Sequence, residues 1–189
     1  RQTLVEIRLL APADHNRANV VTSREVLLEE PRDMSLIAAH PWEGYYTYAK
    51  GNGQSFHSKL QDAIAQADEQ MGVVVDASLK AVWKRSKRLV CTPLALPENL
   101  DVSDMTQAYP EAVAYDLTGC ELTQTLYYVS EGIPVVITLE DGSRRLLVGY
   151  DSANVWIYNP DTKQTSRETI TAAQTQFGAH SSHYTAYLR

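Results

Sequence analysis

Residues 132–160, GIPVVITLEDGSRRLLVGYDSANVWIYNP, constrain the fold more than any other stretch of this chain. Gly132 ends a helical pattern, and the apolar run IPVVITL at 133–139 is typical of a buried strand. The Asp-Gly pair that follows is the signal of a tight hairpin, and RRLLVGYD and NVWIYN supply two further strands. The stretch therefore predicts an antiparallel meander preceded by a helix.

The elements on either side of this meander are predicted to be helical. Thr118 and Glu121 have the T-x-x-E spacing of a capping box, which satisfies exposed amide donors at a helix start. A third helix is expected at about 168–177, followed by a closing strand, HYTAYLR, at 183–189. The apolar stripe of the helix before the meander consists of Leu122, Leu126 and Val129.

Residues 44–86 predict a smaller module. The aromatic run YYTYAKG is expected to form a strand, GNGQSF a loop, and Ser58 the N-cap of a helix that runs to about Met71. VVVDASLKAVW then predicts two strands around a turn, which gives a β-α-β-β order. Residues 92–111 contain three prolines and no periodicity, so we expect a connection there. The apolar face of the helix consists of Leu60, Ala63, Ile64, Ala67 and Met71.

These patterns favour an α+β fold in two abutting parts, either with separate cores or with one shared core. The first part is residues 1–90, with the small module, and the second is residues 91–189, with an antiparallel sheet and flanking helices. A content of 44% hydrophobic and 21% charged residues is that of an ordinary globular protein.

The charge balance bears on partners and on cellular location. The formal net charge of −6 argues against nucleic acid as a partner, because nucleic-acid binding needs a basic surface. WKRSKR at 83–88 is interpreted as a solvated strand end and linker. No apolar stretch is long enough to span a bilayer. Because the chain starts at Arg1 with no signal pattern, we expect an excised ectodomain or processed product, extracellular or at the cell surface.

The order helix, G-x-PVV strand, hairpin, GYD strand and Asn-Pro corner resembles the bacteriocin-leader-peptidase-like branch of the papain-like cysteine peptidases. The resemblance covers about residues 118–162 and implies a papain-like antiparallel sheet with flanking helices. In that family a helix presents the nucleophilic Cys, a strand leads to the His base, and an Asp or Asn before a Pro orients the imidazole. Asn159 falls on the orienting position. The position of the His falls on Ser143, beside Arg144, and neither side chain can be a general base.

Cys120 is the candidate nucleophile, and three alternatives are open for it. A thiol in the first turn of a helix would be activated by the helix dipole, with His180 or His183 as the base. Alternatively, Cys120 is a small apolar core residue beside the helix stripe, or it forms a disulfide with Cys91. The two histidines do not make up a metal site, and neither a metal nor a cofactor is expected.

The small module at 44–86 is faintly similar to peptidoglycan-binding modules of bacterial envelope proteins. That similarity implies that Tyr46, Tyr48 and Trp83 offer stacking faces for a sugar or peptide. The alternative is that these aromatic side chains belong to the core.

Three functions follow from these observations. The leading hypothesis is a non-catalytic peptidase-like domain of a larger bacterial protein, acting by binding a peptide or cell-wall component or as an assembly spacer. The second is an active thiol peptidase or amidase that uses Cys120, Asn159 and His180 or His183. The third is a peptidoglycan, glycan or peptide binder that works through the tyrosine strand.

Overall fold

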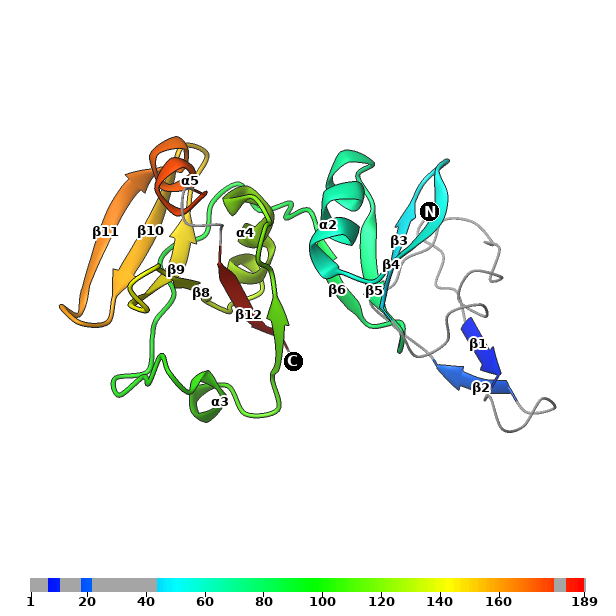
Figure 1. Ribbon diagram of the computed structural model, residues 1–189, viewed down its shortest axis with the longest axis horizontal. Coiled ribbons are helices and arrows are strands. Elements are labelled where there is room, and N and C mark those ends of the chain that lie inside the picture. Colours follow the sequence, from blue (N-terminus) through cyan, green and yellow to red (C-terminus); the bar gives the residue numbers. More distant parts are fainter. Residues whose placement is uncertain (1–6, 11–17, 22–43, 179–182, 189) are drawn as a thin grey trace. The chain divides into compact units, whose positions relative to one another are not determined.

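The computed structural model describes residues 7–10, 18–21, 44–178 and 183–188, and the chain divides into two compact units, residues 1–85 and 86–189. The described part of the first unit combines one helix with β-sheet, and that of the second combines three helices with β-sheet (Figure 1). Every strand pairing among the described residues is antiparallel. The expected α+β class is therefore confirmed.

The first unit contains a two-stranded ladder and a four-stranded sheet. The ladder pairs β1 (Ile7–Leu10) with β2 (Ala18–Val21). Helix α2 (Leu60–Glu69) joins the second and third strands of the sheet along the chain and packs against all four. The sheet has the order β4-β3-β5-β6, with β3 at Tyr45–Ala49, β4 at Gly53–His57, β5 at Val73–Asp76 and β6 at Ala81–Lys84.

Helix α2 buries the apolar face that its spacing predicts, apart from its last member. Leu60, Ala63, Ile64 and Ala67 are buried, and the hydroxyl of Thr47 on β3 donates a hydrogen bond to the Ala63 carbonyl at 3.2 Å. The helix begins after Lys59, so the predicted N-cap at Ser58 is wrong by one residue. Met71 lies beyond the helix end with a positive φ of 56°, and its side chain is therefore 73% exposed.

The segment expected to be a loop before α2 is strand β4. Gly51, with a φ of 76°, makes the tight turn after β3, and β4 then pairs with β3 from Ala49–Gly53 to Tyr45–His57. Because GQSFH has a low strand propensity, the sequence did not predict β4. The pairing of β4 with the aromatic strand β3 stabilises it. The module is therefore β-β-α-β-β rather than β-α-β-β.

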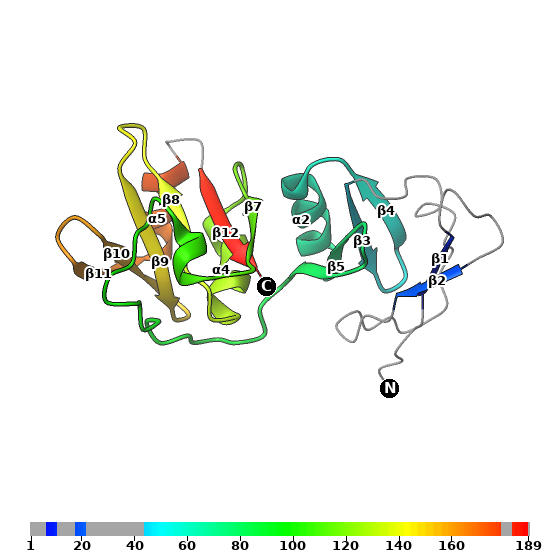
Figure 2. The ribbon, with the colours of Figure 1, turned by 90° about the horizontal axis from the view of Figure 1, so that it is seen from below.

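The second unit contains a six-stranded sheet in the order β11-β10-β9-β8-β12-β7 (Figures 1 and 2). The predicted meander is present as β8, β9 and β10, and the closing strand is β12. The edge strands β7 and β11 carry no apolar alternation that would predict them. The bounds are Val113–Asp116 for β7, Val135–Thr138 for β8, Arg144–Tyr150 for β9, Asn154–Asn159 for β10, Gln164–Thr169 for β11 and Tyr184–Leu188 for β12.

Helix α4 (Leu122–Ser130) precedes the meander, as expected, but its cap differs from the prediction. Its N-cap is Glu121, and the capping box joins Glu121 to Gln124. Thr118 instead donates its backbone N–H to the Asp116 carboxylate at 2.9 Å. Gly119, with a φ of 90°, turns the chain at this point, so helical geometry starts three residues later than the T-x-x-E spacing implies.

The two faces of the six-stranded sheet are covered differently. Helices α4 and α5 (Ile170–Gly178) pack together on the face that carries Leu147 and Ile157. The other face carries Leu146 and Val148, which form a core cluster with Val102 and Met105. Met105 belongs to the short helix α3 (Met105–Ala108), so the segment expected to be a connection lies along a sheet face.

Residues 86–94, called the strap here, are hydrogen-bonded to the C-terminal end of β9. Cys91 forms a two-way backbone bridge with Tyr150, at 2.8 and 2.9 Å, and the Leu94 N–H donates to the Val148 carbonyl at 2.8 Å. Gly149 faces this strap, and a Cβ at that position would lie 2.9 Å from the Cys91 carbonyl oxygen. Only glycine therefore permits this close approach of two backbones.

Candidate functional site

A pocket of about 290 Å³ lies in the second unit, beside the end of β10. Strands β9, β10 and β11 supply one wall, and the last residues of α5 supply another. Its volume is at the lower end of the range for small-ligand pockets. Its lining includes Arg145, Asn159, Gln164, Gln176, Ile157 and Phe177.

The pocket follows from the unequal lengths of β11 and α5. Six residues of strand β11 extend about 20 Å, whereas nine residues of helix α5 extend only about 14 Å. Because α5 starts directly after β11 and packs back onto it, the helix ends before it reaches the β10–β11 turn. Phe177, 2% exposed, is the last side chain that the helix places on the sheet. Beyond it the sheet is uncovered by α5.

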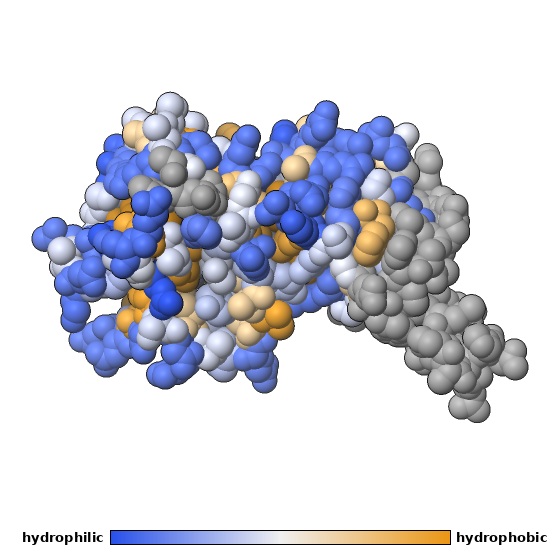
Figure 3. Space-filling view, viewed as in Figure 1, coloured by the Kyte–Doolittle hydropathy of each residue, from blue (hydrophilic) through white to orange (hydrophobic). Residues whose placement is uncertain are grey.

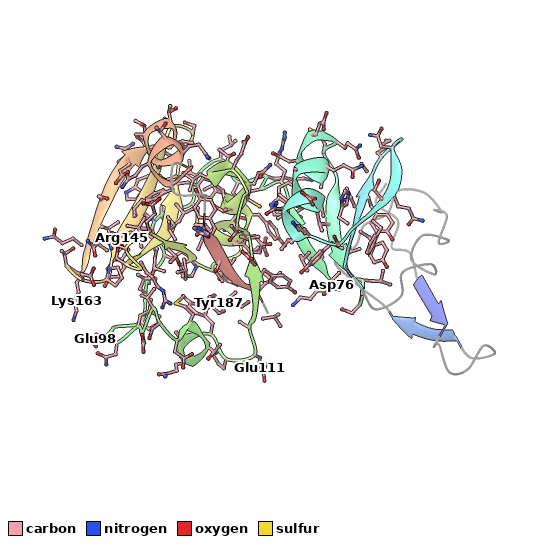
Figure 4. The ribbon with its side chains drawn as sticks, in the orientation of Figure 1. Asp76, Glu98, Glu111, Arg145, Lys163 and Tyr187 are labelled. Atoms are coloured by element: carbon pink, nitrogen blue, oxygen red, sulfur yellow. The ribbon has the colours of Figure 1, made fainter. Side chains whose placement is uncertain are left out.

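Three polar side chains form a row across the end of the sheet that α5 does not cover. On one side, Asn159 pairs with Gln164 of β11. On the other side, β10 pairs Tyr158 with Leu146 of β9. The next pair in the same register is Asn159 with Arg145. All three lie on the face that carries Ile157. Figure 4 shows Arg145 where β9 begins, at the same end of the sheet as Lys163 in the β10–β11 turn.

Arg145 is half-buried, and its described hydrogen bond and ion pair both use one nitrogen. Its side chain is 23% exposed, and Nη1 donates to the Arg144 carbonyl at 2.7 Å and lies 3.6 Å from the Asp161 carboxylate. Asp161 is 73% exposed, so this ion pair is screened by solvent. Among the described residues, Nε and Nη2 of Arg145 contact no acceptor.

Ser143 and Arg144, the positions that the peptidase resemblance aligns with the base, lie outside the pocket. The Ser143 hydroxyl donates to the Asp141 carboxylate at 2.6 Å within the β8–β9 turn. The Arg144 guanidinium donates to the Val102 carbonyl at 3.1 Å, on the opposite face of the sheet. The residue beside Asn159 is thus Arg145, two positions later than the spacing predicts.

Cys120 is buried, with 3% exposure, and lies before the N-cap of α4 rather than in its first turn. Its own N–H donates to the Leu117 carbonyl at 3.0 Å. The amides that follow are also bonded, because Glu121 N–H donates to the Gln124 side chain and Leu122 N–H to the Gln174 side chain of α5. Cys120 is therefore not in the first turn of the helix, and these two amides are not available to an oxyanion.

Cys91 and Cys120 are both buried thiols and are not joined to each other. The Sγ of Cys91 lies 3.5 Å from the Val129 carbonyl oxygen. Burial raises the pKa of the Cys91 thiol, and the nearby Arg88 only partly opposes this shift. Cys91 is therefore protonated at neutral pH and is a poor nucleophile.

Of the two candidate bases, His180 lies outside the described residues. His183 is exposed, and its carbonyl accepts a hydrogen bond from the Thr138 N–H at 3.0 Å where β12 begins. Neither His183 nor Cys120 lines the pocket that contains Asn159. The described residues thus do not bring a histidine, Cys120 and Asn159 into one site.

The proposed stacking residues of the small module are in its interior. Tyr46, Tyr48 and Trp83 are 0%, 3% and 1% exposed. Tyr46 packs against Phe56 with ring centroids 5.4 Å apart. These rings are core residues of the first unit and present no open face to a ligand.

The described residues contain no group of three or more His, Cys, Asp or Glu side chains that could hold a metal ion. None of the helices in the described ranges is both long and apolar enough to cross a membrane. The pocket beside Asn159 is therefore the site that we consider further.

Comparisons with known proteins supply no family for this chain. No family model, curated protein or solved structure matches it. The role of the site thus depends on its geometry alone. Sequence reasoning named Asn159 as a site residue but not Arg145, Gln164 or Phe177, because the first two become its neighbours only through the strand register, which the sequence does not mark.

Proposed function

We propose that residues 86–189 form a non-catalytic, peptidase-like domain that binds a peptide or cell-wall component through the pocket beside Asn159. It would act as part of a larger bacterial protein, outside the cell or at its surface. The domain keeps the order of elements that the peptidase resemblance requires, but it does not keep the base.

The observation that carries this proposal is the position of Arg145. A side chain that orients a catalytic imidazole must lie within hydrogen-bond reach of it, so the base belongs beside Asn159. The residue on the neighbouring strand at that position is Arg145. A guanidinium stays protonated at any working pH and cannot accept the nucleophile's proton. The same charge favours binding of an anionic or polar group.

The environment of Cys120 supports the same conclusion. An active thiol needs exposure and a stabilised thiolate, whereas the side chain of Cys120 is 3% exposed. The nearest helix amides already have side-chain acceptors, Gln124 and Gln174. A buried thiol and helix amides that already have acceptors both support a domain that does not use thiol catalysis.

The test is alkylation of single-cysteine variants. Cys91→Ser leaves Cys120 as the one thiol, and Cys120→Ser is the matched control. We expect iodoacetamide to label neither variant in the native state between pH 6 and pH 8, and to label both after unfolding in urea. Intact mass reports the labelled fraction at each pH.

A second arm incubates the wild-type protein with a peptide library and follows cleavage by mass spectrometry. No cleavage is expected. Rapid native labelling of Cys120 below about pH 7, together with cleavage that Cys120→Ser abolishes, would replace the proposal with the thiol peptidase or amidase hypothesis.

A further inference from the structure

We propose that this pocket is a carboxylate site, in which Arg145 binds a single carboxylate group carried by a short peptide-like chain. This inference rests on the proposed function, because it treats the pocket as a binding site. It adds the chemical class of the ligand and the residue that selects it.

The geometry of the guanidinium supplies the first argument. Arginine has five N–H donors in a planar fork, and the edge formed by Nε and Nη2 matches the two oxygens of a carboxylate. In Arg145 the described contacts with Arg144 and Asp161 use Nη1 alone. The carboxylate-binding edge is therefore left over, on a side chain that is 23% exposed and already held in place.

The neighbours of Arg145 supply neutral donors around the same position. Asn159 accepts the Asp161 N–H with Oδ1 at 3.0 Å, which leaves its NH₂ group available to a ligand oxygen. Gln164 is the partner of Asn159 in the strand register, and its side chain lines the pocket. Neutral amides strengthen anion binding, and they do not repel Arg145 as a second cation would.

The charges near the pocket limit what the anion can be. Arg145 is the cation of the pocket lining, and three carboxylates lie near it: Asp161 is its ion-pair partner, Glu168 lines the pocket, and Asp141 interacts with its charge. A phosphate or other multiply charged anion would be repelled by all three carboxylates. A single carboxylate needs only to replace Asp161, which is 73% exposed and lies 3.6 Å from Nη1.

The size of the pocket explains why the carboxylate should be attached to a chain. Ile157 and Phe177 line the pocket beneath the polar row, but they are only 4% and 2% exposed and give little apolar contact. The volume of about 290 Å³ accommodates a short chain that follows the carboxylate. Free acetate would use the arginine but leave most of this volume empty.

The experiment measures binding of three peptides by NMR of the ¹⁵N-labelled full chain, including the Arg Nε–Hε signals. The first probe is N-acetyl-Ala-Leu-Ala with a free C-terminal acid. The second is the same peptide as its C-terminal amide, which has no carboxylate. The third is N-acetyl-Ala-Leu-Glu-amide, which carries its carboxylate on a side chain.

We expect at least one acidic peptide to bind about tenfold or more tightly than the amide, because a charge-assisted bidentate pair is lost in the amide. The Arg145→Gln variant should lose this preference. Arg167→Gln is the matched control: it removes one charge from β11, on the face opposite the pocket, where Arg167 stacks on Trp156. It should bind as the wild type does.

Each outcome decides the inference. Preference for the first probe identifies a chain-terminal carboxylate as the source, and preference for the third identifies a side-chain carboxylate. Equal binding of all three, absence of binding, or a preference that survives Arg145→Gln overturns the carboxylate site. Mass spectrometry of the recovered peptides tests the proposed function separately from the carboxylate site. Intact peptides agree with a non-catalytic domain, whereas cleaved peptides contradict the proposed function.

Discussion

The sheets of the two units differ in how completely helices cover them. In residues 44–85, helix α2 packs against all four strands, and the strand β3 beneath it is almost entirely buried. In residues 86–189, α5 ends before the β10–β11 turn, and Arg145, Asn159 and Gln164 occupy the end of the sheet that this helix does not cover. The rim of the second unit where β11 lies is mainly hydrophilic in Figure 3, with apolar atoms visible beside it. A sheet that extends beyond its helix can carry a polar site without placing charge in the core.

The largest effect is expected for Tyr46→Ala in the fully covered sheet. Because Tyr46 is 0% exposed and packs on Phe56, its removal should lower the free energy of unfolding of the first unit by about 3–5 kcal/mol. Urea unfolding followed by the fluorescence of the buried Trp83 measures the change. Tyr45→Ala, at a half-buried neighbour, should cost less. Unchanged stability combined with lost saccharide binding would instead make Tyr46 a ligand residue.

The adjacent residues Leu146 and Arg145 test the second sheet, because they lie on opposite faces of β9. Leu146 is 0% exposed in the core cluster, so Leu146→Ala should lower stability by about 2–5 kcal/mol. Arg145→Ala removes a screened ion pair and should cost about 1 kcal/mol or less. Amide exchange of β8–β9 peptides in urea localises both effects to this unit. Equal losses would mean that the pocket end is part of the core.

A smaller effect is expected for Gly149→Ala, where the strap pairs with the end of β9. The new Cβ would come within 2.9 to 3.0 Å of the backbone of Cys91 and Pro93, which must move apart. Stability should fall by about 1–3 kcal/mol, as for other overpacked sites. Ser152→Ala, in the exposed β9–β10 turn, is the control. If Gly149→Ala unfolds like the wild type, the strap is not held as tightly as the structure indicates.

A pH-dependent effect is expected at Asp151. The backbone N–H of Ala153, together with Asn154 and Arg167, lowers the pKa of this carboxyl to about 2. A lowered pKa contributes stability above the unfolded-state value of about 4, and the contribution is lost as pH falls from about 4 to about 2. Melting temperature measured over this range should fall less steeply for Asp151→Asn than for the wild type. Parallel curves would contradict the assignment.

Much of the fold was predictable because apolar side chains recur with a clear period. The stripes of α2 and the runs of β8 and β9 follow from burial on one or both faces of an element. The strands that escaped prediction are edges: QTSRET in β11 has no buried residue, and β4 depends on its pairing with β3. Edge strands bury little, so their sequences carry little pattern.

The candidate site was predictable only in part, for a different reason. Asn159 could be named from its place before a proline, but its neighbour depends on the strand register. A bulge between Trp156 and Ile157 shifts that register by one residue, and no local pattern marks it. The position of Cys120 was missed because the left-handed Gly119 delays the helix. The neighbour of Asn159 and the helix start after Cys120 were thus both mispredicted because of a local irregularity of the backbone, a bulge in one case and a left-handed glycine in the other.

The polar strand β11 also affects how this protein behaves in concentrated solution. An outermost strand exposes unpaired backbone groups that can recruit another chain, and charged side chains such as Arg167 and Glu168 discourage this. The opposite edge, β7, has only four residues but exposes Val113 and Ala114. Strand-to-strand aggregation of the second unit should therefore begin at β7, where adding a lysine would be the simplest way to improve solubility.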